Sequence, residues 1–359
     1  MTVNRRVAIT AILLVLGAVG GEAAVLLGTP MPWMLGSLTL CAVIAMVLRP
    51  KPLEGYSFPK NFRVGFVALI GVMIGAQVTP ALFQQAGQLV WTLTALAVFL
   101  ILCFVGNYVM FRRVGGYDAP TAFFSSSPGG LLESILMGEA SGADSRVLIA
   151  QQYLRIVLVI TLVPLALSLW LGVPVGSAAG LELTTGGAAV GVSEVLITLV
   201  AAAVGLGLAR LIKLPAAQLT GPMLVAAAAT LTGVLEMQLP VWMIAVAQIV
   251  IGVSLGIRFQ GLEPALLRRS IGLAALTVGY MLALAGIFAT ALTSVTGIPA
   301  LTLVIAFAPG GVAEMSLVAL SLAANPALVS LHHILRILMT VAALGIVMRF
   351  MGFDAPKDR

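Results

Sequence analysis

The chain consists largely of apolar runs that are long enough to cross a lipid bilayer. An α-helix rises 1.5 Å per residue, so about 20 apolar residues span the hydrocarbon core. Ten runs approach or exceed this length, 60% of the 359 residues are hydrophobic, and only 9% are charged. Because lipid offers no hydrogen bonds to the backbone, runs of this length are predicted to be helices. The sequence therefore predicts an all-α integral membrane protein.

The predicted spans fall into two groups of five. They are 7–27, 33–48, 64–83, 89–111 and 147–171 in the first half, and 192–212, 219–237, 241–258, 271–293 and 327–348 in the second. Each half also contains a sixth apolar stretch, at 120–142 and 299–324, that Pro-Gly-Gly interrupts. Such a stretch can cross the membrane, or it can enter and return to the same side. This choice decides the topology.

The two halves are copies of one unit. Shifting the sequence by 181 residues aligns two Pro-Gly-Gly tripeptides, two glutamates and two arginines without a gap. The matched pairs are Pro128 with Pro309, Gly129 with Gly310, Gly130 with Gly311, Glu133 with Glu314, Gln151 with His332, Gln152 with His333, and Arg155 with Arg336. These residue types are costly in lipid, so the match is more than a similarity of apolar runs. We predict a first repeat at 1–175, a linker at 176–190, a second repeat at 191–350 and a cytoplasmic tail at 351–359.

The basic residues orient the spans. If each Pro-Gly-Gly stretch returns to its own side, each repeat has five crossings. With a cytoplasmic N-terminus, all 19 Lys and Arg residues except Arg155 and Arg336 then lie on the inner side, as the positive-inside rule requires. If the stretches crossed instead, several of these residues would change sides. Because five is odd, the second repeat inserts upside down. This predicts ten transmembrane helices as two inverted five-helix repeats, each with a re-entrant hairpin.

The remaining composition argues against several classes of protein. The net charge is +6, but the basic residues lie in short loops and on no single face, so no direct nucleic-acid binding is expected. Cys41 and Cys103 lie in apolar runs, and the two histidines are adjacent, which is not a metal-ligand spacing. The chain has no nucleotide-binding loop. We therefore expect no cofactor, no metal and no enzymatic activity.

The two Pro-Gly-Gly tips form the candidate substrate and ion site. Proline lacks an amide donor and glycine tolerates unusual dihedrals, so both tips leave backbone groups free to face a ligand. The helix that resumes after each tip presents amides suited to an anion. Ser126 and Ser127 add hydroxyls before the first tip only. The alternative is a tight hairpin turn that binds nothing.

Four charged residues complete this candidate site. Glu133 and Glu314 follow the tips by three residues, which suggests a proton or sodium coupling role, or else a structural carboxylate at a helix start. Arg155 and Arg336 lie well inside their predicted helices, where they could bind a carboxylate or phosphate. Alternatively, each arginine pairs with the glutamate of its own repeat.

Polar side chains accompany each arginine. Gln151 and Gln152 precede Arg155, and His332 and His333 stand at the equivalent positions in the second repeat. Gln151 and His332 lie one helical turn before the arginines, on the same face. The histidines could also shuttle a proton, because imidazole titrates near neutrality. All four are therefore candidate substrate or ion contacts.

Three motifs with partners in the second repeat resemble a known family. They are Pro-Trp-Met-Leu-Gly-Ser at 32–37, Ser-Ser-Pro-Gly-Gly at 126–130 and Gln-Gln-Tyr-Leu-Arg at 151–155. They look like the bacterial AbrB family of membrane proteins, over essentially the whole chain. Members are often labelled ammonia monooxygenase or transporter, and the founding member is described as a regulator of another gene's expression. The duplicated unit is also distantly similar to citrate and glutamate symporters, for which a homodimer is common.

Two readings of function follow. In the first, the chain is a secondary transporter of the bacterial inner membrane with both termini in the cytoplasm. Its partners would be the lipid bilayer, a small solute for which an anion is one candidate, a coupling proton or sodium ion, and as one option a second copy. In the second reading, it is a membrane regulatory protein that affects gene expression indirectly, without transport.

Overall fold

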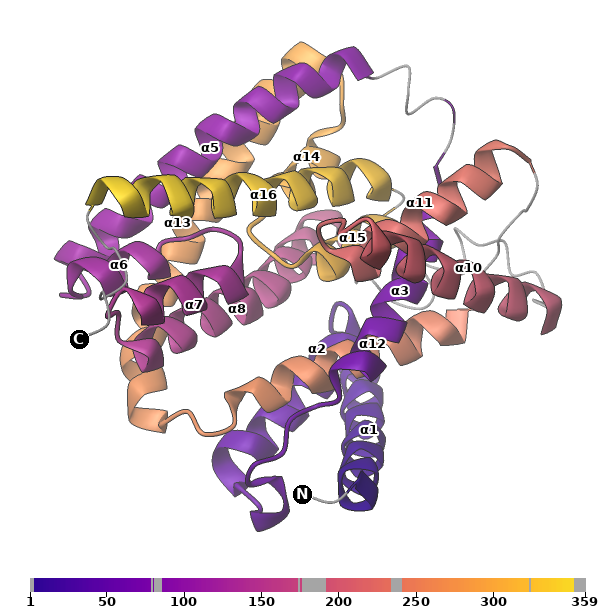
Figure 1. The fold of residues 1–359 in the computed structure, drawn as a ribbon, viewed down its shortest axis with the longest axis horizontal. Helices are drawn as coiled ribbons and strands as arrows, with labels where there is room; N and C mark the ends of the chain where they lie inside the picture. The colour runs from indigo at the N-terminus through magenta and orange to yellow at the C-terminus, as the bar shows by residue number, and fades with distance from the viewer. Residues whose placement is uncertain are drawn as a thin grey trace. The chain divides into compact units, whose positions relative to one another are not determined.

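A computed structural model of the chain describes residues 3–78, 80, 86–173, 175, 192–233, 241–322 and 324–351 (Figure 1). Within these ranges all regular secondary structure is helical, which confirms the predicted all-α class. The predicted linker at 176–190 lies outside the described residues, as does the tail after Met351.

The helices follow the repeats in chain order. The first repeat contributes α1 (Val3–Leu26), α2 (Pro32–Val43), the π-helical η1 (Ile44–Leu48), the 3-10 turn η2 (Lys51–Leu53), α3 (Lys60–Ala76), α5 (Ala86–Arg113), α6 (Ala119–Ser125), α7 (Leu131–Ala140) and α8 (Ser145–Leu171). The second contributes α10 (Val192–Leu211), α11 (Ala217–Leu231), α12 (Val241–Gly256), the 3-10 turn η3 (Ile257–Phe259), α13 (Pro264–Thr296), α14 (Ala300–Phe307), α15 (Val312–Ser321) and α16 (Pro326–Met351).

Seven of these helices are long and apolar enough to cross a membrane, as is typical of a multi-pass membrane protein. They are α1, α5, α8, α10, α12 with η3, α13 and α16. The other three predicted spans coincide with the shorter helices α2, α3 and α11. Two of those spans, 64–83 and 219–237, continue past residues 78 and 233, where described ranges end. Ten crossings therefore stay a prediction.

The chain forms two compact units, and each unit takes segments from both repeats. Unit 1 comprises Met1–Gln84, Thr161–Gly261 and Ala313–Ala327, and unit 2 comprises Gln85–Ile160, Leu262–Val312 and Leu328–Arg359. Unit 1 thus holds α1 to α3 with α10 to α12. Unit 2 holds α5 to α7 with α13, α14 and α16. Most corresponding parts of the two repeats therefore belong to the same compact unit. The exceptions are α15, which lies mainly in unit 1 while α7 lies in unit 2, and the end of α8 from Thr161, which lies in unit 1.

In unit 2, α13 runs beside α5 and also contacts α14 (Figure 1). Rings of Phe99 in α5, Phe288 in α13 and Phe307 in α14 contact one another, with centroids 5.3 to 5.9 Å apart. In the first repeat, the ring centroids of Phe104 in α5 and Phe123 in α6 lie 5.1 Å apart. Aromatic packing thus anchors the short helices α6 and α14, which lead into the two Pro-Gly-Gly tips.

Glycines bring the helices of unit 1 into backbone contact, once in each repeat. A Cβ added to Gly36 of α2 would lie 2.1 Å from the carbonyl oxygen of Gly20 in α1. The same relation is found 185 residues later, where a Cβ on Gly221 of α11 would lie 2.1 Å from the carbonyl oxygen of Gly205 in α10. Only glycine permits this approach. The sequence repeat is therefore also a repeat of contacts.

Further glycine contacts join the repeats reciprocally in unit 1. Helix α3 packs on α11, and α12 packs on α2. At each of four glycines, an added Cβ would lie 2.2 to 2.6 Å from a carbonyl oxygen of the facing helix. The pairs are Gly71 with Leu219, Gly75 with Met223, Gly252 with Met34, and Gly256 with Leu38. Such an exchange of equivalent contacts is what a two-fold relation between the repeats produces. Their opposite insertion in a bilayer stays a prediction.

Replacing Gly205 by alanine is expected to destabilise the protein, because the methyl group would lie 2.5 Å from the backbone of Pro222. Overpacking of this kind costs on the order of 1–3 kcal/mol. Gly207, in the same helix, has no atom within 4 Å of the position that a Cβ would take, so Gly207→Ala is the matched control. The melting temperature of the purified protein in detergent should fall for the first variant only. Equal melting temperatures would contradict the close helix contact.

Candidate functional site

Each Pro-Gly-Gly tripeptide interrupts a helix. α6 ends at Ser125 and α7 begins at Leu131, while α14 ends at Phe307 and α15 begins at Val312. Gly130, which precedes α7, has a φ of 59°, a left-handed conformation that glycine adopts without strain. Both repeats therefore contain the predicted non-helical tip, whereas the re-entrant path through a bilayer stays a prediction.

A buried arginine closes each break. Arg155 of α8 donates from Nη1 to the carbonyl oxygen of Ser127, and Arg336 of α16 donates from Nη1 to the carbonyl oxygen of Ala308. All four residues are equivalent at the offset of 181. In an unbroken helix, each of these carbonyls would accept from the amide four residues later. Past each tip that position is Leu131 or Val312, the first residue of the next helix, and the guanidinium donates to the carbonyl oxygen in its place. The carbonyl oxygen of Ala308 also accepts from the amide of Gly310 at 2.8 Å.

A second contact is also repeated. Gln152 donates from Nε2 to the carbonyl oxygen of Phe124 at 2.9 Å, and Nε2 of His333 lies 3.0 Å from the carbonyl oxygen of Ile305. The glutamine amide and the imidazole thus occupy equivalent positions, holding the last turn of α6 and of α14. Together with the arginines, they tie each broken helix to the helix that follows it.

The adjacent histidines are held by different carbonyls. A carbonyl oxygen only accepts, so a neutral His333 carries its proton on Nε2. Nδ1 of His332 lies 2.9 Å from the carbonyl oxygen of Leu328, which requires the opposite tautomer. The other ring nitrogen of each is buried and has no hydrogen-bond partner among the described residues. The predicted proton shuttle through them stays a prediction.

The two breaks differ in the donor that reaches the first glycine carbonyl. In the first repeat, the hydroxyl of Ser127 donates to the carbonyl oxygen of Gly129. The second repeat has alanine in place of that serine, and Arg336 donates from Nη2 to the carbonyl oxygen of Gly310 instead. Arg336 is therefore committed to two carbonyls. Arg155 bonds to one within the described chain and keeps more donors for another partner.

The first tip lies beside the helix that carries Arg336. A Cβ on Gly129 would lie 3.2 Å from Oγ1 of Thr340, one turn after that arginine. Six buried polar atoms of the first broken helix, of α8 and of α16 have no partner among the described residues; they are Arg155 Nε, Arg336 Nε, Thr340 Oγ1, Ser125 Oγ, Ser134 Oγ and Gln152 Oε1. Buried polar atoms are usually hydrogen-bonded, so this cluster suits a ligand site.

The two glutamates have different surroundings. Glu133 is half-buried in the first turn of α7 and forms no ion pair with Arg155 in the structure as described. Glu314 is buried in the first turn of α15, and its carboxylate lies 3.9 Å from the guanidinium of Arg63 in α3. These contacts differ from the alternative in which Arg155 and Arg336 each pair with the glutamate of their own repeat. The coupling role of the glutamates stays a prediction.

Comparison with known proteins places the chain in a family. A family model described as "Transition state regulatory protein AbrB" matches residues 33–352. The chain belongs to the AbrB family. The resemblance that the duplicated motifs indicated is therefore confirmed.

Two relatives of this AbrB-family protein are similar over most of their length. "Uncharacterized protein YhjN" of Bacillus subtilis (strain 168) is 25% identical over 345 residues, which cover 92% of this chain and 89% of the relative. "Putative regulator AbrB" of Escherichia coli (strain K12) is 26% identical over 303 residues, covering 83% of this chain and 85% of the relative. The relationship therefore extends over both repeats.

Some contacts of the AbrB-family site were missed at the level of sequence. Asn107 of α5 is buried, and its Nδ2 donates to the carbonyl oxygen of Ser126 at 3.3 Å. A lone amide within the apolar run 89–111 was the available signal. The sequence predicts Arg63 on the cytoplasmic side of the membrane, and nothing in its sequence context indicates a contact with Glu314.

Gln151 faces away from the tip contacts. Its Nε2 donates to the hydroxyl oxygen of Tyr117 at 2.8 Å and lies 3.4 Å from the carbonyl oxygen of Ser270. It still precedes Arg155 by one helical turn. It therefore connects the site to the loop after α5 and to α13, whereas Gln152 makes the contact with α6.

Replacing Arg336 by glutamine is expected to lower stability more than Arg155→Gln, because Arg336 donates two charged hydrogen bonds to backbone carbonyls and Arg155 donates one. A hydrogen bond to a charged group contributes about 1.5–3 kcal/mol. Arg336→Lys should fall between the native protein and Arg336→Gln, since an ammonium lacks the planar fork. Melting temperatures of the purified variants give the order. A larger loss for the Arg155 variant would contradict the unequal roles.

Proposed function

We propose that this AbrB-family protein is a secondary transporter of the bacterial inner membrane, which moves a small organic or inorganic anion in exchange or symport with protons or sodium. The observation that carries this proposal is the pair of broken helices, each closed by a buried arginine. The proposal includes ten spans in two inverted repeats, with both termini in the cytoplasm.

Broken helices favour transport because a break leaves backbone amides and carbonyls free to bind a substrate or an ion. In transporters with inverted repeats, substrates and ions bind near the bilayer midplane where helices are interrupted. Non-helical backbone at that depth needs protein or a polar cavity around it. Here both tips contact arginine side chains, and the amides that open α7 lie next to the first tip. Together these donors suit an anion.

The charge balance also favours an anion. Arg155 and Arg336 are 7% and 2% exposed, and burying a cation is costly unless an opposite charge compensates it. Their described partners are backbone carbonyls, which bond to the guanidinium but carry no net charge. A bound anion would supply the missing negative charge. Arg155, which is bonded to one carbonyl, is the better placed of the two to contact it.

The glutamates are the proposed coupling groups. Glu133 is half-buried near the first tip and has no ion pair among the residues described, so its carboxylate could take up a proton or contact sodium. Glu314 already faces Arg63 and would exchange that partner for a proton. The two sites would therefore contribute unequally to coupling.

A second function is favoured by names alone. The family description and the Escherichia coli relative both carry the word regulator. A regulatory protein without transport would change gene expression when deleted and would show no solute flux. In that case, the buried arginines would serve only to complete the broken helices.

Reconstitution in proteoliposomes tests transport directly. Uptake of labelled monocarboxylates, dicarboxylates and phosphate should exceed that of protein-free vesicles for at least one anion, and should rise when a pH or sodium gradient is imposed. The double variant Glu133→Gln with Glu314→Gln should lose the gradient dependence. Flux at background for every anion would contradict transport, and gradient dependence retained in the double variant would contradict coupling through these residues.

The asymmetry between the breaks gives a sharper test. Ser127→Ala leaves the carbonyl of Gly129 to accept from Arg155, as the carbonyl of Gly310 accepts from Arg336. The affinity for the transported anion should then fall about tenfold, because one charged hydrogen bond is lost. Ala308→Ser adds a hydroxyl at the equivalent position and should not weaken binding. Unchanged affinity in Ser127→Ala would contradict a role for the free donors of Arg155.

A further inference from the structure

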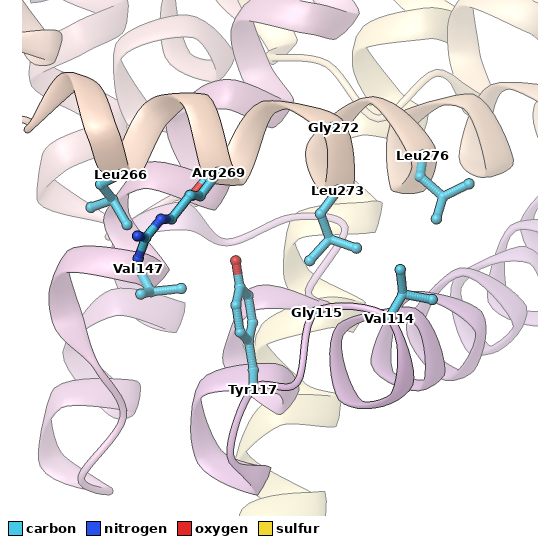
Figure 2. Close-up of a pocket in the computed structure, with 10 residues that line it drawn as sticks. Val114, Gly115, Tyr117, Val147, Leu266, Arg269, Gly272, Leu273 and Leu276 are labelled. Atoms are coloured by element: carbon cyan, nitrogen blue, oxygen red, sulfur yellow. The ribbon is translucent and has the colours of Figure 1, made fainter.

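A pocket of about 490 Å³ lies in unit 2, away from the two tips (Figure 2). It is formed by the loop after α5, the first turns of α8 and the N-terminal third of α13. Its volume is within the range of small-molecule sites in proteins. None of the tip residues or buried arginines lines it, so it is a separate feature of the protein.

One side of the pocket carries hydrogen-bond donors and a positive charge. Arg269 is the charged residue among its lining residues, and it forms no ion pair or hydrogen bond within the described chain. Figure 2 shows the hydroxyl of Tyr117 pointing toward α13. That hydroxyl accepts from Gln151, so its own proton is free for another acceptor. The pocket therefore suits an anionic group.

Three contacts hold Tyr117 in this position. Its hydroxyl accepts from Gln151 at 2.8 Å, its carbonyl oxygen accepts from Nη1 of Arg112 at 2.6 Å, and its ring stacks on Phe111 with centroids 5.6 Å apart. The donor at the mouth of the pocket is therefore fixed before any ligand binds, which lowers the entropic cost of binding.

The other side of the pocket is apolar and open. Val114 is 68% exposed and Leu276 is 46% exposed, and both line the pocket. Between Arg269 and Leu276 lies Gly272, which has no atom within 4 Å of the position that a Cβ would take. A free space with apolar walls thus extends along α13 from the positive end. Gly272 and Leu276 lie in the predicted span 271–293, so this wall faces the hydrocarbon of the bilayer, where an acyl chain can cover it.

We infer that this pocket binds an acidic phospholipid, with its phosphate at Arg269 and Tyr117 and an acyl chain along Gly272 to Leu276. The predicted topology puts the basic ends of α5 and α13 at the cytoplasmic surface, where acidic lipids attract basic pockets between helices. Gln151 joins Tyr117 to the helix of Arg155, so the lipid contacts the wall of the proposed transport site. The binding itself does not depend on transport.

Native mass spectrometry of the full-length protein in detergent tests this inference. Phosphatidylglycerol should be retained in preference to phosphatidylcholine with the same chains. Arg269→Gln should lower the affinity for phosphatidylglycerol about fivefold, since one basic residue near a charged surface contributes about that factor. Arg268→Gln is the control, because Arg268 is an exposed neighbour that does not line the pocket. Equal losses in the two variants would overturn the inference in favour of general surface charge.

Two further measurements separate a lipid from a small anion. Gly272→Leu should fill the space for the acyl chain and lower the retention of both lipids, while the elution volume and melting temperature of the protein stay unchanged. Glycerol phosphate at millimolar concentration should not displace phosphatidylglycerol. Full displacement by glycerol phosphate, or unchanged lipid binding in Gly272→Leu, would overturn the assignment of a lipid. Loss of transport in proteoliposomes would leave these binding results unaffected.

Discussion

The fold of unit 2 depends on how a chain can break a helix in an apolar environment. A Pro-Gly-Gly tip leaves the carbonyls before it without their helical donors, and lipid cannot replace them. In both repeats, an arginine of the long helix that follows the broken one, α8 or α16, donates to the carbonyl oxygen of the residue just before the tip. The break and the arginine are therefore one device. The arginine would be unfavourable alone, because a buried cation without polar partners is costly.

The two copies of this device differ in one hydrogen bond. A single hydroxyl, that of Ser127, bonds the glycine carbonyl that its counterpart arginine bonds in the second repeat. Arg336 thus donates to two carbonyls of its tip, whereas Arg155 donates to one. The two tips therefore share their geometry but differ in the number of guanidinium donors that the backbone uses.

Sequence reasoning identified the repeat, both tips, both arginines and the family, because these features are carried by rare residues at fixed spacing. It could not identify the carbonyls that the arginines bond, since a contact across 28 residues depends on how α8 packs on α6. The pairing of Glu314 with Arg63 was out of reach for the same reason. The ends of two predicted spans also could not be compared with the structure. The apolar runs that contain α3 and α11 continue past residues 78 and 233, where the described ranges end.

The reciprocal glycine contacts of unit 1 bear on how the protein is made. Helix α12 packs on α2, and α11 packs on α3. When the first repeat leaves the ribosome, α2 and α3 therefore lack these partners from the second repeat. These helices must wait in the bilayer until more than a hundred further residues have been synthesised. During that interval, their glycine faces are covered only by lipid or by membrane chaperones. Assembly of this frame is therefore a late event, and a ribosome that stops midway leaves a first repeat in which α1 packs on α2 while α2 and α3 lack their partners from the second repeat.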